Sequence, residues 1–157
     1  MKIKMLVIGK TDDKNIEQLI EKYQQRLKHY INFEMEIIQD IKNVKNLSQL
    51  QQKEKEGELI LSKVKSTDQL VVLDEKGKEY RSLEFASFLQ KKMNSGIKQL
   101  VLVIGGPYGF SEAVYKKATG KISLSKMTFS HQMIRLFIVE QLYRGFTILK
   151  NEPYHHE

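Results

Sequence analysis

The chain contains no cysteine among its 157 residues. This absence excludes disulfide bonds, zinc sites built on thiolates, iron–sulfur clusters and a cysteine nucleophile. The four histidines are scattered at positions 29, 131, 155 and 156. A zinc site made only of histidine and carboxylate ligands is therefore hard to build, and we expect no metal centre.

Long hydrophobic runs are also lacking. The most apolar segment, Leu100–Ile104, is far shorter than the roughly 20 residues that a membrane-spanning helix needs. Lys4 interrupts the apolar stretch near the N-terminus, which leaves no continuous core for a secretory signal. We therefore expect a soluble, cytoplasmic protein that does not act at a membrane.

The sequence has only two prolines, Pro107 and Pro153, and no linker rich in proline, glycine or serine. It also lacks internal repeats and low-complexity tracts. A length of 157 residues suits one domain with one core, and 41% hydrophobic with 29% charged residues is a globular composition. We expect a single domain over residues 1–157.

Acidic residues are too few to balance the basic ones. The chain has 26 Lys and Arg against 19 Asp and Glu, a formal net charge of +7. Such an excess favours a polyanionic partner, with nucleic acid as the first candidate. The positive charges are spread along the whole sequence, so they locate no binding surface, and a lysine-rich composition alone also explains them.

Strand-like and helix-like apolar patterns alternate along the chain. The patterns predict strands at about 2–8, 33–37, 70–73, 99–104 and 122–124, and helices at about 13–27, 48–64, 82–93, 112–118 and 131–149. The segment 74–77 is expected to be a turn. This alternation predicts an α/β fold with a mostly parallel sheet flanked by helices on both faces.

Two nucleotide-binding motifs are absent. Residues 9–11, Gly-Lys-Thr, imitate the end of a phosphate-binding P-loop, but Lys4 stands where that loop needs its first glycine. The dinucleotide fingerprint G-x-G-x-x-G is also missing. Without a glycine-rich loop there is no nest of backbone N–H groups for phosphates, so nucleotide hydrolysis is excluded.

The sequence Gly-Gly-Pro-Tyr-Gly at residues 105–109 follows the most apolar predicted strand. Open α/β sheets bind their ligands beyond the carboxyl ends of such strands. Adjacent glycines let the backbone approach a ligand closely, and Pro107 stiffens the loop. A tight turn between a strand and a helix, without any ligand, fits the same residues equally well.

A polar loop at 124–130 leads into the longest predicted helix. His131 and Arg135 lie four residues apart on one face, near the positive end of the helix dipole. This face could hold a carboxylate or a phosphate, although a capped helix with surface cations is the commoner reading. Arg144 and the segment 153–156, Pro-Tyr-His-His, would suit stacking on bases or docking of the tail on a partner subunit.

These motifs together resemble a known family. The segments that carry the likeness are 103–109, 124–135, 140–144 and 153–155, in matching order and spacing, with 1–10 and 53–57 in support. They are similar to the ribosomal RNA large subunit methyltransferase H family, small pseudouridine N3-methyltransferases of the SPOUT superfamily. Tyr108, Phe110 and Gly145 depart from the family pattern, which affects local loop shape more than chemistry.

The resemblance implies properties that periodicity does not reveal. It implies a trefoil knot in the C-terminal part, roughly residues 100–157, although threaded chains are very rare. It implies a homodimer that takes its methyl group from S-adenosyl-L-methionine and acts on a pseudouridine in helix 69 of 23S rRNA within the assembled 70S ribosome. The implied cofactor contacts are Leu73, Gly105, Leu124, Ser125, Lys126, Met127, Thr128 and Phe129.

The chemistry of this reaction suggests further roles. Pseudouridine N3 attacks better once its proton is lost, so a general base is expected, with His131 and His155 as candidates. Arg135 and Arg144 would orient phosphate or the cofactor carboxylate, and Arg144 and Tyr154 would contact RNA. The segment Asn151–Glu157 of one subunit could complete the other subunit's site. The alternatives are a non-catalytic RNA- or ribosome-binding factor and, less compatible with the charge, a small-molecule methyltransferase.

Overall fold

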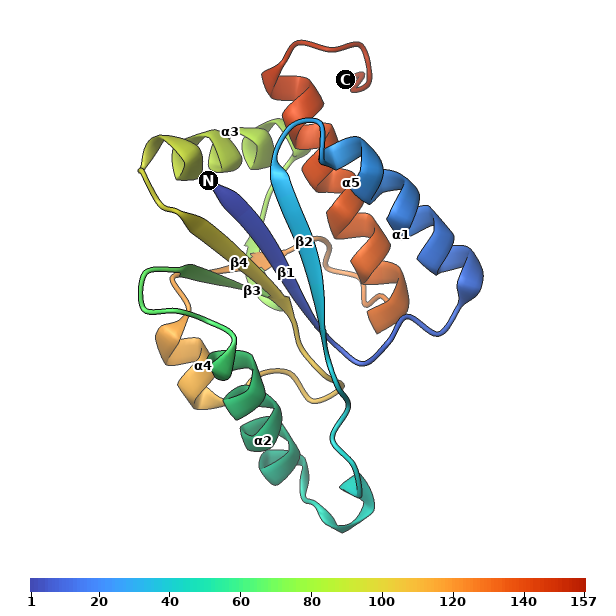
Figure 1. Ribbon diagram of the computed structural model, residues 1–157, viewed down its shortest axis with the longest axis vertical. Coiled ribbons are helices and arrows are strands. Elements are labelled where there is room, and N and C mark those ends of the chain that lie inside the picture. The colour runs from blue at the N-terminus through green and yellow to red at the C-terminus, as the bar shows by residue number, and fades with distance from the viewer.

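A computed structural model describes residues 1–157 as one sheet with helices on both faces (Figure 1). The elements in chain order are β1 (Lys2–Ile8), α1 (Lys14–Leu27), β2 (Asn32–Ile38), a 3₁₀ turn (Val44–Asn46), α2 (Gln49–Ser62), β3 (Gln69–Glu79), α3 (Ser82–Asn94), β4 (Gln99–Ile104), α4 (Glu112–Lys117), β5 (Gly120–Ser123) and α5 (His131–Leu149). The strand order is β2-β1-β4-β3-β5, and every pairing is parallel. The predicted α/β fold is confirmed.

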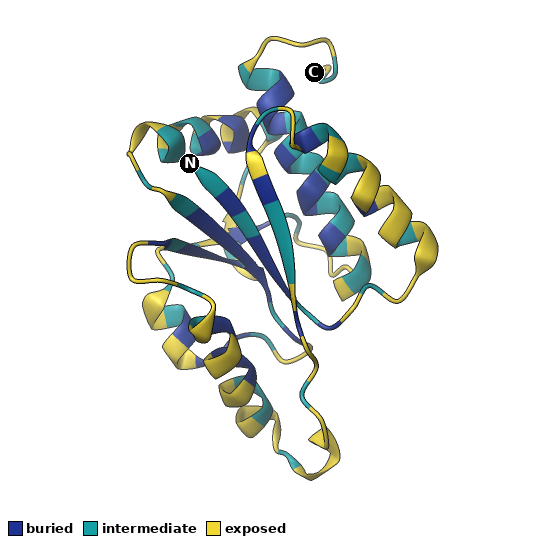
Figure 2. Ribbon diagram, in the orientation of Figure 1, coloured by how far each residue is buried: buried dark blue, intermediate teal, exposed yellow.

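Successive side chains of a strand point to opposite faces of the sheet, so β1 contributes to two cores. Ile3 and Met5 join the larger core, which α1, α3 and α5 cover. Leu6 joins the smaller core together with Ile60 of α2 and Val114 of α4. Figure 2 shows the buried residues concentrated in the strands and on the inward sides of these helices.

Side-chain caps fix where most helices begin. Asp13 accepts hydrogen bonds from the backbone of α1, Ser48 forms a capping box with Gln51 at α2, and Ser111 accepts from Val114 at α4. These three caps follow from the sequence, because Asp and Ser side chains satisfy the free N–H groups of a first turn. Ser130 caps α5 in the same way.

The strand β3 is longer than the sequence predicts. The expected strand ended at Leu73 with a turn at 74–77, but β3 continues to Glu79 after an irregularity between Leu73 and Lys78. Both Leu73 and Lys78 pair with Ile122 of β5. A Cβ at Gly77 would lie 2.6 Å from the backbone of Ile122, so a glycine is needed there. The polar segment is a strand because pairing of backbones needs no apolar side chains.

The parallel arrangement places three connecting segments at one edge of the sheet. The residues after β4, the irregular part of β3 and the residues after β5 all emerge where the strands reach their carboxyl ends. The start of α5 follows the segment after β5 directly. Segments that are distant in sequence are thereby brought together at the edge where open α/β sheets bind ligands.

Candidate active site

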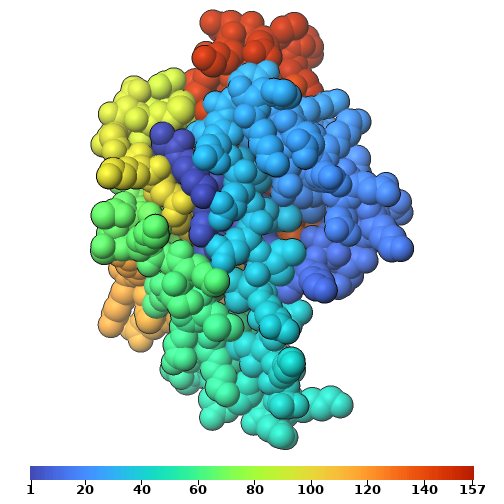
Figure 3. Space-filling model, in the orientation of Figure 1, coloured from blue at the N-terminus to red at the C-terminus, as the bar shows by residue number.

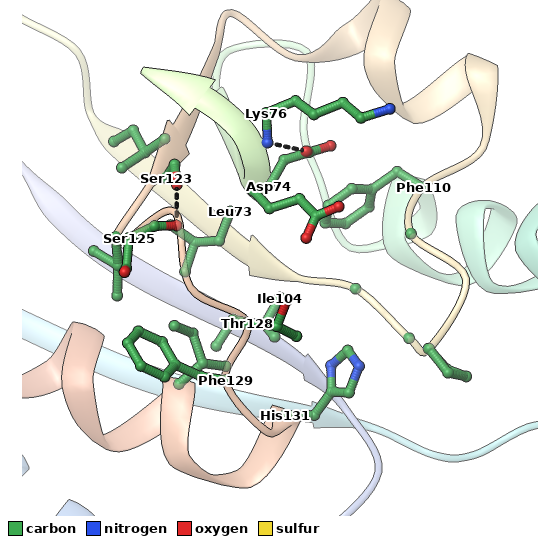
Figure 4. Close-up of a pocket in the computed structure, with 18 of the residues that line it drawn as sticks. Leu73, Asp74, Lys76, Ile104, Phe110, Ser123, Ser125, Thr128, Phe129 and His131 are labelled. Carbon is green, nitrogen blue, oxygen red and sulfur yellow. Dashed lines mark hydrogen bonds between the residues drawn. The ribbon is translucent and has the colours of Figure 1, made fainter. Parts of the chain in front are cut away.

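A cavity of about 430 Å³ lies at this edge of the sheet (Figure 4). Its volume falls within the range of small-molecule sites. It is lined by 21 residues, 10 of them hydrophobic. They come from four places: 73–76 in β3, 104–110 at and after the end of β4 with Tyr115 of α4, 122–125 and 127–129 at and after the end of β5, and His131 with Ile134 in α5. The cavity therefore depends on the packing of β3, β4 and β5 beside the start of α5.

Seven of the eight expected cofactor contacts line this one cavity. They are Leu73, Gly105, Leu124, Ser125, Met127, Thr128 and Phe129. The eighth, Lys126, is exposed and does not line it. The structure thus gathers residues from 73 to 129 around one volume, but it places the Lys126 side chain outside.

The glycine loop brings bare backbone to the cavity wall. A Cβ at Gly106 would collide with the carboxylate of Glu56 in α2. That carboxylate is buried, and Gln52 Nε2 donates to it over 3.0 Å. Gly109 has φ +82°, a backbone conformation that residues with a side chain rarely adopt. Its N–H donates to the Gly106 carbonyl over 3.2 Å. The loop is therefore a tight turn that lines the cavity.

The loop after β5 is held by its own hydrogen bonds. Ser123 Oγ donates to the Ser125 carbonyl over 2.8 Å, and the Met127 N–H donates to Ser125 Oγ over 3.0 Å. Phe129 packs edge-on against Phe137 of α5, with ring centroids 5.0 Å apart. These contacts shape the loop before any ligand binds.

Sequence reasoning missed a polar pair in the cavity wall. The Asp74 carboxylate accepts hydrogen bonds from the Lys76 N–H and from the Tyr115 hydroxyl. Burial and this hydrogen bond raise the pKa of Tyr115 to about 12. The Lys121 ammonium lies over the Tyr115 ring, 4.3 Å from its centroid. An Asp directly after a buried strand is a signal that could have drawn attention to this pair.

The two residues of the expected anion-binding face of α5 have different surroundings in the structure. His131 lines the cavity, whereas Arg135 is 2% exposed and does not reach it. The Arg135 guanidinium donates to the carbonyls of Ile8 and Gly9 over 2.7 and 2.9 Å and to Thr11 Oγ1 over 3.2 Å. Burial lowers the pKa of Arg135. Its Nη groups are already used, so the structure gives Arg135 no access to a ligand in this cavity.

The tail residues expected to act in the site form a separate cluster around Glu140. Arg144 forms an ion pair with Glu140, and the Tyr154 hydroxyl donates to the same carboxylate over 3.0 Å. His155 Nδ1 lies 3.3 Å from Arg144 Nη1, while its buried Nε2 makes no hydrogen bond and lies 3.9 Å from Glu157 Oε1. Burial, followed by hydrogen bonds to Tyr23 and Glu140, raises the pKa of Tyr154.

The tail cluster does not line the cavity within one chain. Arg144 is 13 residues beyond His131 in α5, about 20 Å along a helix with a rise of about 1.5 Å per residue. Figure 3 shows the C-terminal residues gathered at one end of the molecule, opposite the residues around 45–55. His155, Arg144 and Tyr154 are therefore together, but apart from His131.

The structure contains no group of three or more His, Asp or Glu residues arranged to hold a metal ion. None of its helices combines the length and the apolar character that crossing a membrane requires.

Comparison with known proteins identifies relatives over the full chain. A family model described as predicted SPOUT methyltransferase matches residues 1–155. Proteins of Flavobacterium psychrophilum and Flavobacterium johnsoniae are 71% and 69% identical to this chain, and one of Parabacteroides distasonis is 66% identical. In each case the match covers 100% of both chains. All three relatives are named ribosomal RNA large subunit methyltransferase H.

Proposed function

Because the chain belongs to the SPOUT methyltransferase family, we propose that it methylates the RNA of the large ribosomal subunit with S-adenosyl-L-methionine as methyl donor. Its target is N3 of a pseudouridine in helix 69 of 23S rRNA, within the assembled 70S ribosome in the cytoplasm. The observation that carries this proposal is the single cavity lined by Leu73, Gly105 and five of the six residues 124–129.

The cavity residues fit the methyl donor. Neither Gly106 nor Gly105 has free space for a Cβ. At Gly105 a Cβ would lie 2.9 Å from the Phe110 ring. Bare backbone in such a wall can contact a ligand closely. Leu73, Gly105 and the loop 124–129 would hold the donor, with backbone groups of the loop available to its adenine.

The bound donor supplies an electrophilic methyl group on a positively charged sulfur. Deprotonated N3 of the pseudouridine would accept this methyl group, and the donor would be released as a neutral thioether. The protein's main task is to hold the two reactants in line. His131 is the only histidine that lines the cavity, and we propose that its imidazole accepts the N3 proton.

His155, the second candidate base, requires a partner subunit. We propose that the protein is a homodimer in which Asn151–Glu157 of one subunit complete the cavity of the other, with Arg144 and Tyr154 placed to contact RNA. One observation supports this: the tail cluster does not line the cavity of its own chain, so these residues can act in catalysis only at the cavity of another subunit.

We also propose that roughly residues 100–157 form a trefoil knot. The path of the chain supports this. From the edge strand β5, residues 124–130 lead back to α5, and five of them (124, 125 and 127–129) line the same cavity as 73–76 and 104–110.

The second candidate function is a ribosome-binding factor without catalysis. The net charge of +7 suits both a methyltransferase and a binding factor, because each binds the polyanionic RNA. The cavity favours the enzyme, since a binding factor leaves this volume without a role.

Transfer of labelled methyl from S-adenosyl-L-methionine tests the proposal. The acceptors are ribosomes that lack the modification, separated subunits and naked 23S rRNA. We expect label in 23S rRNA, strongest from intact ribosomes. Salt-sensitive ribosome binding with no label in any acceptor, and no binding of the donor, would instead identify the non-catalytic factor.

A further inference from the structure

Tyr108 is an aromatic residue in the cavity wall that contacts no other ring. It lines the cavity from the glycine loop, and 44% of its surface is exposed. The other aromatic residues of the wall are paired: Phe110 packs on Tyr115 with centroids 5.7 Å apart, and Phe129 packs on Phe137. Tyr108 has neither a ring contact nor a hydrogen bond from its hydroxyl. Its ring is therefore free to stack on a ligand.

The backbone on either side of Tyr108 is fixed in a turn at the cavity. Pro107 precedes it with a fixed φ, and Gly109 follows in a left-handed conformation at φ +82°. The hydrogen bond from the Gly109 N–H to the Gly106 carbonyl closes the turn around it. Met127 also lines the cavity and is 74% exposed. Two exposed side chains from separate loops thus border one cavity.

We propose that Tyr108 stacks on the base that is methylated. This inference rests on the proposed function. A base can be brought into line with a donor inside the cavity only after it leaves its stack in the RNA. Unstacked RNA bases bind to aromatic side chains, which replace the stacking that they lose. Tyr108 provides such a surface beside the donor site, and Met127 provides an apolar surface on a second loop.

Kinetics of Tyr108 variants test this role. Tyr108→Phe and Tyr108→Trp keep a ring, whereas Tyr108→Leu keeps apolar area without one. Base stacking contributes about 1–3 kcal/mol, so kcat/KM for ribosomes should fall about 5- to 150-fold in Tyr108→Leu. It should stay near the wild-type value in the two aromatic variants. The KM for S-adenosyl-L-methionine and the melting temperature should not change. Leu50→Ala is the control, because Leu50 is 59% exposed in α2 and does not line the cavity.

A spectroscopic readout separates stacking from a change of loop shape. The chain has no tryptophan, so Tyr108→Trp introduces a single tryptophan, whose emission can be excited apart from that of the tyrosines. Its emission should be quenched by an RNA stem-loop with an unpaired pseudouridine, at RNA concentrations that inhibit methyl transfer to ribosomes. The emission of Leu50→Trp should not change under the same conditions.

Three results would overturn the inference. The first is a wild-type kcat/KM for ribosomes in Tyr108→Leu, and the second is a rise in the KM of Tyr108→Leu for S-adenosyl-L-methionine as large as its loss of kcat/KM for ribosomes. The third is emission of Tyr108→Trp that the RNA does not quench. These results can be told apart from a failure of the proposed function itself. If the proposed function is wrong, the wild-type protein transfers no methyl group to any ribosomal acceptor.

Discussion

Arg135 in α5 donates from its guanidinium Nη2 to the carbonyl of Ile8, the last residue of β1, over 2.7 Å. Nη1 donates to the next carbonyl, that of Gly9. Three residues earlier on α5, Gln132 Oε1 accepts from the Asp12 N–H over 2.9 Å. The start of α5, which carries His131, is thus attached to the end of β1. Arg135 positions the helix that bears the proposed base.

Replacing Arg135 should therefore reduce stability. Arg135→Met leaves the carbonyls of Ile8 and Gly9 without these donors in a buried environment. Each buried unsatisfied group costs about 1–3 kcal/mol, so we expect the free energy of unfolding in urea to fall by about 2–4 kcal/mol. Wild-type stability combined with lost donor binding would contradict this role and support the anion-binding role that the sequence suggests.

Tyr115 should make the free energy of unfolding fall at alkaline pH. Its pKa is raised from 10.0 to about 12 by burial and by the hydrogen bond to Asp74. The folded protein therefore holds this proton more tightly than the unfolded chain does. The resulting stabilisation is fully present below pH 10 and is lost as the pH rises from about 10 to about 12.

Tyr115→Phe isolates this contribution, because the variant has no phenolic proton. Urea unfolding at pH 8 and pH 11 should show a larger loss of stability for the wild type than for Tyr115→Phe. Tyr30, whose pKa is also raised to about 12, titrates equally in both proteins and cancels in the comparison. Equal losses would show that Tyr115 does not bind its proton more tightly when folded.

The strands that carry the site could be predicted from the sequence, because their signals are local. Leu100–Ile104 is apolar throughout, and it is a central strand buried on both faces. The continuation of β3 through Gly77 could not be predicted in this way. Its polar residues are those of a turn, and only the backbone of β5 beside them makes a strand.

The candidate site depends on relationships that no local pattern contains. Periodicity puts His131 and Arg135 on one face of α5, but it does not reveal that the end of β1 covers Arg135 and leaves His131 at the cavity. Asp74 and Tyr115 are 41 residues apart and meet only through the sheet. Physical reasoning alone indicated three parts of the cavity region: the glycine loop, the polar loop before α5 and His131. The assignment of Leu73 and residues 124–129 as cofactor contacts came from the family resemblance.

Lys126 offers a test of how far that resemblance extends. The family pattern makes it a cofactor contact, but its exposed side chain lies outside the cavity and forms no ion pair. We expect Lys126→Ala to weaken ribosome binding and to lower the dependence of binding on salt by about one charge. The KM for S-adenosyl-L-methionine should stay constant. A rise in that KM with unchanged salt dependence would restore Lys126 to the cofactor site.

The two histidines allow a test of catalysis and of subunit arrangement together. We expect His131→Ala to lower kcat by about 100-fold or more, as loss of the proposed proton acceptor does. We expect His155→Ala to lower kcat strongly as well, because it removes a side chain that completes the opposite cavity. In a homodimer whose tails complete the opposite cavities, one subunit supplies His131 and the other supplies His155 to each site. Refolding an equal mixture of the two variants makes half of the dimers mixed, and one of the two sites in each mixed dimer has both histidines. Activity should then recover to about a quarter of the wild-type value.

If each chain uses its own tail, the mixture stays as inactive as the separate variants. Full turnover in both variants and in the double variant would remove histidine from the mechanism.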